Sequence, residues 1–84
     1  MPKIVPVNWR TLEAVFLRVG FEFNRQQGSH RAYVRAGVAR PVVIPTYAEV
    51  PVFIIRNNLK TAGLYNLKTA GLSRDDYFRL LAAR

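Results

Sequence analysis

Residues 21–37 read FEFNRQQGSHRAYVRAG, and apolar and polar side chains alternate along this stretch on both sides of a glycine. A period of two is typical of half-buried strands, and Gly28 and Gly37 mark tight turns between them. We therefore expect an antiparallel meander of three strands, over residues 21–25, 29–36 and 38–44. Pro41 lies inside the third run, which indicates an edge strand or a bulge because proline donates no hydrogen bond to a neighbouring strand.

Apolar residues at helical spacing flank this meander on both sides. In the first helix Asn8 is a candidate N-cap, and Gly20 stands where a glycine commonly follows a helix end. A second helix is expected to begin at Pro51. A last helix is expected after Ser73, with Asp76 in the capping-box position. The expected buried positions are Trp9, Leu12, Val15, Phe16 and Val19 in the first helix, Val52, Ile55, Leu59 and Ala62 in the second, and Tyr77, Leu80 and Leu81 in the last.

The charge of the chain gives the first indication of its partner. Among 84 residues, 13 are Lys or Arg and 5 are Asp or Glu, so the formal net charge is +8. Most of these cations are arginines, whose planar guanidinium matches the geometry of phosphate. We expect so small and basic a domain to meet a nucleic acid or an acidic protein.

Several classes of protein are excluded by what the sequence lacks. With no cysteine, the chain forms neither a disulfide nor a thiolate metal site, and one histidine with five scattered carboxylates makes no convincing metal cluster. No apolar run approaches the ~20 residues of a membrane span. The N-terminus lacks the apolar segment of a signal peptide. We therefore expect a soluble cytoplasmic protein without metal or cofactor.

His30 is the only histidine and follows the glycine turn directly. An unperturbed imidazole titrates near pH 6.5, so this side chain is the best candidate for moving a proton near neutral pH. Strict alternation places His30 on the side of Ala32 and Val34, at the rim of the core. The opposite side carries Arg31, Tyr33 and Arg35. A purely structural histidine is the alternative, and periodicity alone favours it.

Cleavage of RNA needs a base for the ribose 2′-OH, balance for the charge on the phosphorane, and an acid for the leaving 5′-oxygen. His30 fits the base or the acid role, and the sequence does not name the second group. The candidate RNA-binding residues are Ser29, Arg31, Tyr33, Arg35 and Lys60. The two arginines can hold phosphate, and the tyrosine either stacks on an unpaired base or packs across strands. The serine is expected to be a turn or hydrogen-bonding residue.

Residues 58–65 and 66–73 form a tandem repeat in which seven of eight positions are identical. Eight helical residues turn by roughly 800°, so the second copy would not present the same face as the first. A longer helix, a second short helical turn and a bulged loop are the three open arrangements.

A longer helix is expected to run through Gly63 to about Ala70, because glycine inside a helix costs only about 1 kcal/mol relative to alanine. Eight added residues lengthen a helix by about 12 Å. The last helix would then leave its own sheet and pack on a second protomer, giving a domain-swapped homodimer. A monomer whose extra copy bulges out is the rival.

These features, in this order, resemble the HicA toxin family, the ribonuclease half of a bacterial toxin–antitoxin pair. The resemblance covers most of residues 8 to 81, and the duplication departs from it. The segments that carry it are Gly20-Phe21, Gly28-Ser29-His30, Tyr33, Val43-Ile44-Pro45, the run from Asn58 to Leu64, and the acidic start of the last helix.

The resemblance implies a single α+β domain over residues 1–84, of order α-β-β-β-α and similar to a double-stranded-RNA-binding domain. Its three-stranded antiparallel sheet would carry helices on one face. It also implies mRNA cleavage that depends on His30 and neutralisation by a HicB-type antitoxin. The leading hypothesis is therefore a metal-independent endoribonuclease toxin. A non-catalytic RNA-binding module and a basic protein-interaction domain on the same fold are the alternatives.

Overall fold

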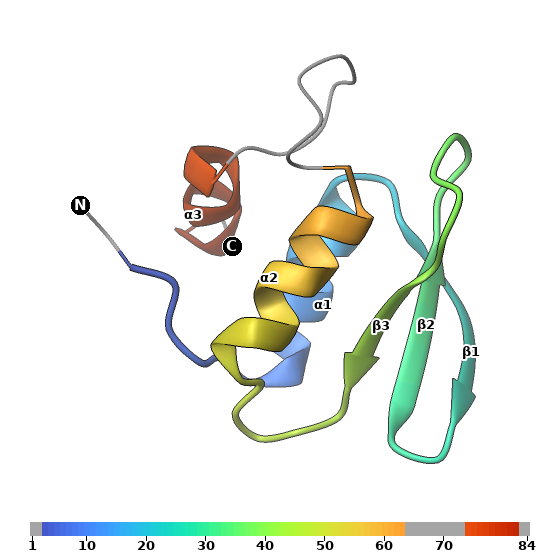
Figure 1. Cartoon of the computed structure of the whole chain (residues 1–84), viewed down its shortest axis with the longest axis horizontal. Helices are drawn as coiled ribbons and strands as arrows, with labels where there is room; N and C mark the ends of the chain where they lie inside the picture. Colours follow the sequence, from blue (N-terminus) through green and yellow to red (C-terminus); the bar gives the residue numbers. More distant parts are fainter. Residues whose placement is uncertain (1–2, 64–73, 83–84) are drawn as a thin grey trace.

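The computed structural model describes residues 3–63 and 74–82 of the chain. Within these ranges the helices and strands follow one another in the order helix, three strands, two helices (Figure 1). Their bounds are α1 Trp9–Arg18, β1 Glu22–Gln27, β2 His30–Val34, β3 Val42–Pro45, α2 Val52–Thr61 and α3 Arg74–Ala82. None of these helices has the length and apolar character that a membrane crossing requires.

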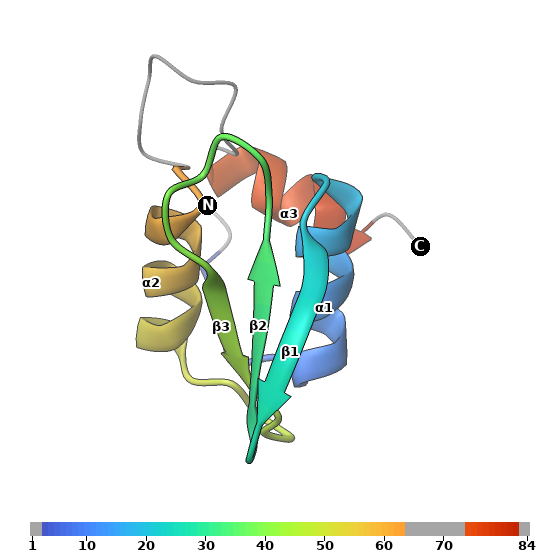
Figure 2. The same cartoon turned by 90° about the vertical axis from the view of Figure 1, so that its right-hand side faces the viewer.

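The three strands form one antiparallel sheet in the order β1-β2-β3, so β2 is the central strand. The helices lie together on one face of this sheet, and Figure 2 shows the other face turned toward the viewer. The predicted α+β fold is confirmed. The third strand is shorter than the expected run over 38–44, because it begins only at Val42 and Pro41 lies outside it. Residues 35–38 instead form a turn, in which the Val38 N–H donates to the Arg35 carbonyl over 3.1 Å.

Both ends of α1 are set by local signals in the sequence. The Asn8 side chain accepts a hydrogen bond from the Arg10 N–H at 2.9 Å, which caps the first turn. At the other end Gly20 has a φ of 92°, a conformation that favours glycine. The Phe21 N–H then donates to the Phe16 carbonyl at 3.0 Å, and the two rings pack edge to face with centroids 5.5 Å apart. This glycine stop turns the chain directly from α1 into the sheet.

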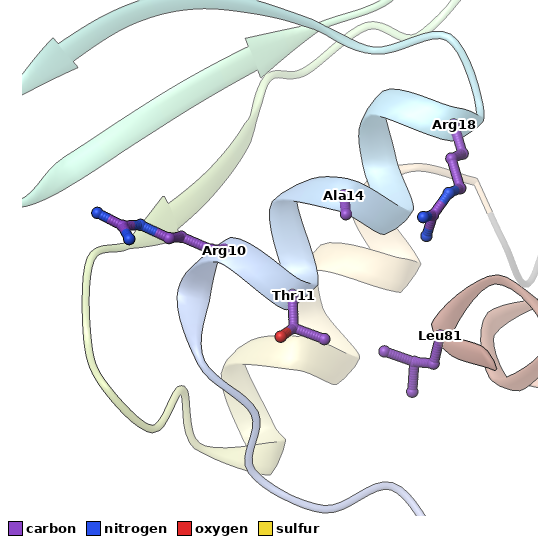
Figure 3. A pocket seen from close by; sticks show the side chains of 5 residues that line it. All are labelled: Arg10, Thr11, Ala14, Arg18 and Leu81. Atoms are coloured by element: carbon purple, nitrogen blue, oxygen red, sulfur yellow. The ribbon is translucent and has the colours of Figure 1, made fainter. Parts of the chain in front are cut away.

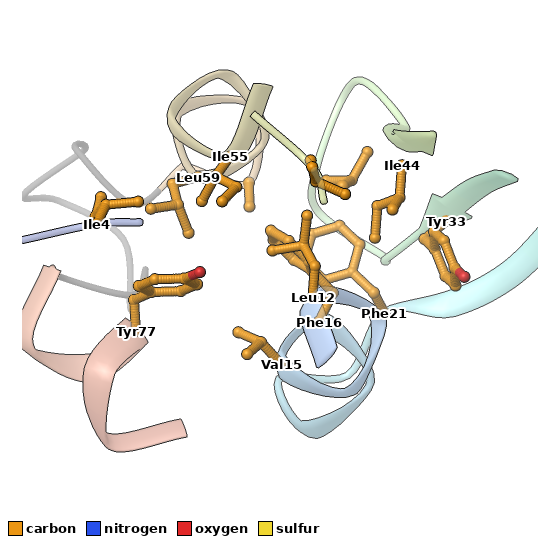
Figure 4. Packing of buried hydrophobic residues seen from close by; sticks show 13 residues of the cluster. Ile4, Leu12, Val15, Phe16, Phe21, Tyr33, Ile44, Ile55, Leu59 and Tyr77 are labelled. Atoms are coloured by element: carbon orange, nitrogen blue, oxygen red, sulfur yellow. The ribbon is translucent and has the colours of Figure 1, made fainter. Parts of the chain in front are cut away.

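The core lies between the sheet and the helices, and Figure 4 shows Tyr77 pointing from α3 into it. The expected apolar faces of α1 and α2 are confirmed at their centres, whereas Trp9, Val19 and Val52 are only partly buried. On α3, Leu80 and Leu81 are partly buried. The buried residues are Ile4, Leu12, Val15, Phe16, Phe21, Tyr33, Val42, Ile44, Val50, Ile55, Leu59, Ala62 and Tyr77.

The expected long second helix is wrong. α2 ends at Thr61, and Gly63 has a φ of 80°, outside the helical region, because a glycine just past a helix end prefers the left-handed conformation. α3 packs on α1 of the same chain, where Arg18 Nη1 donates to the Leu80 carbonyl at 2.8 Å. The domain-swapped dimer therefore stays a prediction, but the long second helix on which it depended is not formed. The second repeat copy, residues 66–73, and the expected cap at Ser73 lie outside the described residues.

One polar cluster joins α1 to the inner face of the sheet. The Tyr33 hydroxyl donates to the Glu13 carboxylate of α1 and accepts a hydrogen bond from Arg31 Nε at 2.9 Å. Arg31 also pairs with Glu13 at 3.3 Å and donates to Gln26 Oε1 at 2.8 Å. Its guanidinium lies 4.1 Å from the centroid of the Phe23 ring. We call Glu13, Tyr33 and Arg31 the inner clamp.

Alternation along β2 is as predicted, but the face that turns inward is not the expected one. Tyr33 is fully buried and stands in register with buried Val42. Val34, on the opposite side, is 37% exposed. The sequence had placed the Ala32 side of the strand at the rim of the core. An arginine and a tyrosine occupy that position instead, because the inner clamp satisfies their polar atoms.

The buried hydroxyl of Tyr77 leads to a prediction about stability. It has no hydrogen-bond partner among the described residues, and such a group costs about 1–3 kcal/mol. Tyr77→Phe should therefore raise the free energy of unfolding by about 1 kcal/mol, whereas Tyr77→Ala should lower it by about 3–5 kcal/mol. Urea unfolding followed by circular dichroism measures both changes. A loss of stability in Tyr77→Phe would show that the hydroxyl is bonded.

The effect of Tyr77→Phe on the free energy of unfolding should also depend on pH in the alkaline range. Burial raises the pKa of Tyr77 to about 12, whereas an unfolded tyrosine ionises near pH 10. The unfolded chain therefore releases this proton first, and stability falls as the pH rises from about 10 to 12. The fall should be smaller in Tyr77→Phe. It does not vanish, because burial also raises the pKa of Tyr33 to about 12.

The inner clamp predicts that Arg31 stabilises the fold. Arg31→Gln removes bonds to Glu13 and Tyr33 and leaves both polar groups without that partner. The free energy of unfolding should drop by about 1–3 kcal/mol. The matched control is Arg25→Gln, an exposed arginine of the same sheet, which should stay within about 0.5 kcal/mol. Equal values for the two variants in urea unfolding would contradict a structural role for Arg31.

Candidate functional site

His30 is the first residue of the central strand and its side chain is exposed. The backbone stands in register with Gln27 of β1 on one side and Pro45 of β3 on the other. Because the inner clamp takes the odd-numbered positions of β2, His30 points to the sheet face that no helix covers (Figure 2). No side chain in the described ranges forms a hydrogen bond with the imidazole. The ring is therefore open to solvent on a backbone that is held from both sides.

The turn before His30 is tied to the loop that follows β3. The Ser29 carbonyl accepts two hydrogen bonds from Thr46, at 2.7 Å from the N–H and 3.1 Å from the hydroxyl. Ser29 thus contributes its backbone to the position of His30, as expected for a turn residue. Tyr47, the next residue of the loop, is 43% exposed. An exposed aromatic ring therefore stands on the segment that joins the histidine turn.

Arg25 also belongs to the face of His30, and a bulge in β1 is the reason. Phe23 is in register with Tyr33, but the next pair in the ladder is Arg25 with Ala32. Asn24 is therefore an extra residue, and the side chains after it change face. Without this bulge, simple alternation would point Arg25 inward. With it, Arg25 is a diagonal neighbour of His30, a position about 7–8 Å away in antiparallel pairs.

The residues expected to bind RNA beside His30 are mostly elsewhere. Arg31 faces the helices, where the inner clamp and the rings of Trp9 and Phe23 engage its guanidinium. Tyr33 is fully buried, and its ring packs on Phe23 with centroids 6.0 Å apart. The Tyr33 ring therefore has no exposed face on which a base could stack. Of its two predicted roles, the structure favours packing across strands. Neither side chain is available to a ligand on the outer face.

Arg35 and Lys60 lie at the opposite end of the sheet from His30. The Arg35 guanidinium rests against the turn after α1, where a Cβ atom on Gly20 would come within 3.5 Å of its Nε. Lys60 is in the last turn of α2, which Figure 1 shows beside the β2–β3 loop and away from the β1–β2 hairpin. Of the five predicted RNA-binding residues, only Ser29 and Arg31 adjoin His30, and the Arg31 side chain points to the other face of the sheet.

Sequence reasoning missed Arg25 and Tyr47. Arg25 was assigned to no face, because the bulge that turns it outward has no marker in the strand pattern. Tyr47 was placed in a connector without a role.

A hollow of about 340 Å³ lies between α1 and α3, away from the outer face of the sheet (Figure 3). Four α1 residues and one α3 residue line it, namely Arg10, Thr11, Ala14, Arg18 and Leu81. It holds no group that could accept a proton near neutral pH, and Arg18 already donates to the Leu80 carbonyl. The outer face around His30 is therefore the better candidate for chemistry.

Comparison with protein families matches residues 9–64, well over half of the chain, to the family described as "HicA toxin of bacterial toxin-antitoxin". The match begins at the first residue of α1 and takes in the whole sheet and α2, including the hairpin that presents His30. Searches of the curated proteins and of the solved structures gave no significant match. The order of helices and strands and the glycines that follow α1 and α2 are consistent with this family match. The chain belongs to the HicA family of toxins from bacterial toxin–antitoxin systems.

Proposed function

We infer that this toxin is a metal-independent endoribonuclease that cleaves mRNA in the cytoplasm and is held in check by a HicB-type antitoxin. The observation that carries the inference is the place of His30. The only imidazole of the chain is exposed on the helix-free sheet face, next to a hairpin turn that Thr46 holds in place. A histidine kept for packing alone would be expected on the buried face of β2.

The reaction that suits this site is attack of the ribose 2′-oxygen on the adjacent phosphorus. The P–O5′ bond breaks, and the products are a 2′,3′-cyclic phosphate and a 5′-hydroxyl. His30 takes the 2′-OH proton or delivers a proton to the leaving 5′-oxygen. Water completes the other transfer, since the described neighbours of His30 on the outer face, Gln27, Pro45, Ala32 and Arg25, offer no second imidazole and no carboxylate. No step needs an oxidant or a further reactant.

Arg25 and Tyr47 complete the proposed site. Arg25 stands on the outer face where it can hold the phosphate whose charge grows in the transition state. It takes over the role that the sequence had given to Arg31. Tyr47 offers an exposed ring on which an unpaired base can stack, in place of the buried Tyr33. Both roles are proposals from position and exposure.

An antitoxin fits the same face. Val34 and Val43 are 37% and 39% exposed there; Val43 is a diagonal neighbour of His30, and Val34 stands in register with Glu22 at the other end of β2. A HicB-type partner with apolar and acidic side chains would cover these residues and block access to His30. The rival function, an RNA-binding module without catalysis, shares the basic charge and differs in needing no imidazole at this place.

Replacement of His30 tests the activity directly. The purified chain in EDTA should cleave single-stranded RNA, and His30→Gln should lose at least about a hundredfold in rate while its RNA affinity stays the same. An RNA with 2′-O-methyl riboses should bind and remain intact, because the attacking hydroxyl is blocked. Cleavage that persists in His30→Gln would overturn the role of His30. Binding of RNA without cleavage by the native chain would favour the RNA-binding module.

Arg25 is expected to act in the transition state. Arg25→Gln should lower the cleavage rate at saturating RNA by about 10–100-fold, the loss typical of one missing charge-assisted contact. The matched control is Arg56→Gln, which removes the same charge from an exposed position on α2. The two variants should bind RNA about equally. If Arg25→Gln weakens binding and leaves the maximal rate unchanged, Arg25 belongs to the general basic surface.

A further inference from the structure

A second polar hollow lies at the end of the domain opposite to His30. It has a volume of about 590 Å³ and is bounded by the β2–β3 loop and the last turns of α2. The residues that line it are Ala39, Arg40, Asn57, Lys60 and Thr61. None of these lining residues of the described chain is a carboxylate, and the hollow contributes nothing to the site around His30. The proposed cleavage reaction therefore leaves this hollow without a role.

The lining side chains suit an anion. Asn57, Lys60 and Thr61 stand at positions i, i+3 and i+4 of α2, so they share one face of the helix. Arg40 lines the same hollow from the β2–β3 loop. Neither Arg40 nor Lys60 forms an ion pair with a residue in the described ranges. Two cations, an amide and a hydroxyl thus converge on one hollow, which is the donor set of a phosphate site.

A simpler explanation accounts for only part of this arrangement. The carbonyl end of α2 is the negative end of its dipole, and a lysine in the last turn is favourable there without any ligand. That explains Lys60. It does not explain Arg40, which comes from a different element and approaches the same hollow. The negative helix end would also weaken an anion site, and the pair of cations offsets it.

We propose that this hollow binds a backbone phosphate of the RNA several nucleotides away from the bond that is cut. The identity of the anion as RNA rests on the proposed function, whereas the phosphate site stands on the hollow itself. β2 alone covers about 13 Å from His30 to Val34, at ~3.3 Å per residue. A substrate that reaches both ends of the sheet must be longer than the cleaved dinucleotide, so the hollow sets a preference for longer RNA.

The test compares a double variant with a control of equal charge. Arg40→Gln/Lys60→Gln removes both cations of the hollow, and Lys3→Gln/Arg79→Gln removes one lysine and one arginine that do not line it. Binding is measured with an uncleavable 2′-O-methyl RNA long enough to span the sheet. The first variant should bind at least tenfold more weakly, and the slope of log K against log salt should become shallower by about 1.4, or about 0.7 for each lost contact. The control should change the slope by less.

Cleavage separates this proposal from the proposed function. The double variant should cut a trinucleotide, which is too short to reach the hollow, at the native rate, and should lose rate only on the long RNA at subsaturating concentration. Failure of His30→Gln to stop cleavage would overturn the mechanism and leave the binding result intact. Equal losses in both double variants would overturn the phosphate site. Binding of polyglutamate is measured with the same variants. If Arg40→Gln/Lys60→Gln binds polyglutamate more weakly while its salt slope for RNA is unchanged, the phosphate site is overturned and the hollow is assigned to an acidic protein. The single variants Arg40→Gln and Lys60→Gln repeat the comparison if the double variant does not fold.

Discussion

The hydrogen bonds among Glu13, Tyr33 and Arg31 decide which face of the central strand turns toward the helices. Side chains alternate along a strand, so once these residues face inward, His30 must face outward. The helices of the described ranges occupy only the inner side of the sheet, and none of them covers its outer side. An exposed imidazole on a well-held backbone is therefore a consequence of how α1 is attached to the sheet, and its openness does not come from a flexible loop.

Local sequence signals predicted the elements that they control by themselves. The cap at Asn8 and the stop at Gly20 are both confirmed, because each depends on bonds to residues a few positions away. The inward face of β2 could not be predicted in this way. An arginine counts as polar in an alternating pattern, and only α1 and the neighbouring strand supply the carboxylate and the rings that accept it. The bulge at Asn24 has the same origin, since it exists only relative to β2. The sequence analysis assigned phosphate contact to Arg31 and omitted Arg25 because neither the inner clamp nor the bulge can be recognised from the local sequence.

The basic charge of the chain is not gathered around its histidine. Within the described ranges, Arg35, Arg40 and Lys60 lie toward the end of the sheet where α2 finishes, and His30 lies toward the other. This division separates the histidine that we propose as the proton-transfer group from the cations that we propose as phosphate ligands.

Gly63 ends α2 within the first copy of the repeat, and α3 still packs on α1 eight repeated residues later. Each copy of the repeat contains a glycine at the same position, and α2 ends just before the first of them. An added copy therefore enters the chain after the residues that form α2. With the second copy present, α1, the sheet, α2 and the packing of α3 on α1 are all in place. α2 itself ends on the side of the domain that carries Arg40 and Lys60, opposite to His30. If copies of the repeat are added or lost after α2, the change follows the helix that carries Lys60 of the proposed phosphate site, and the proposed cleavage chemistry at His30 is inherited unchanged.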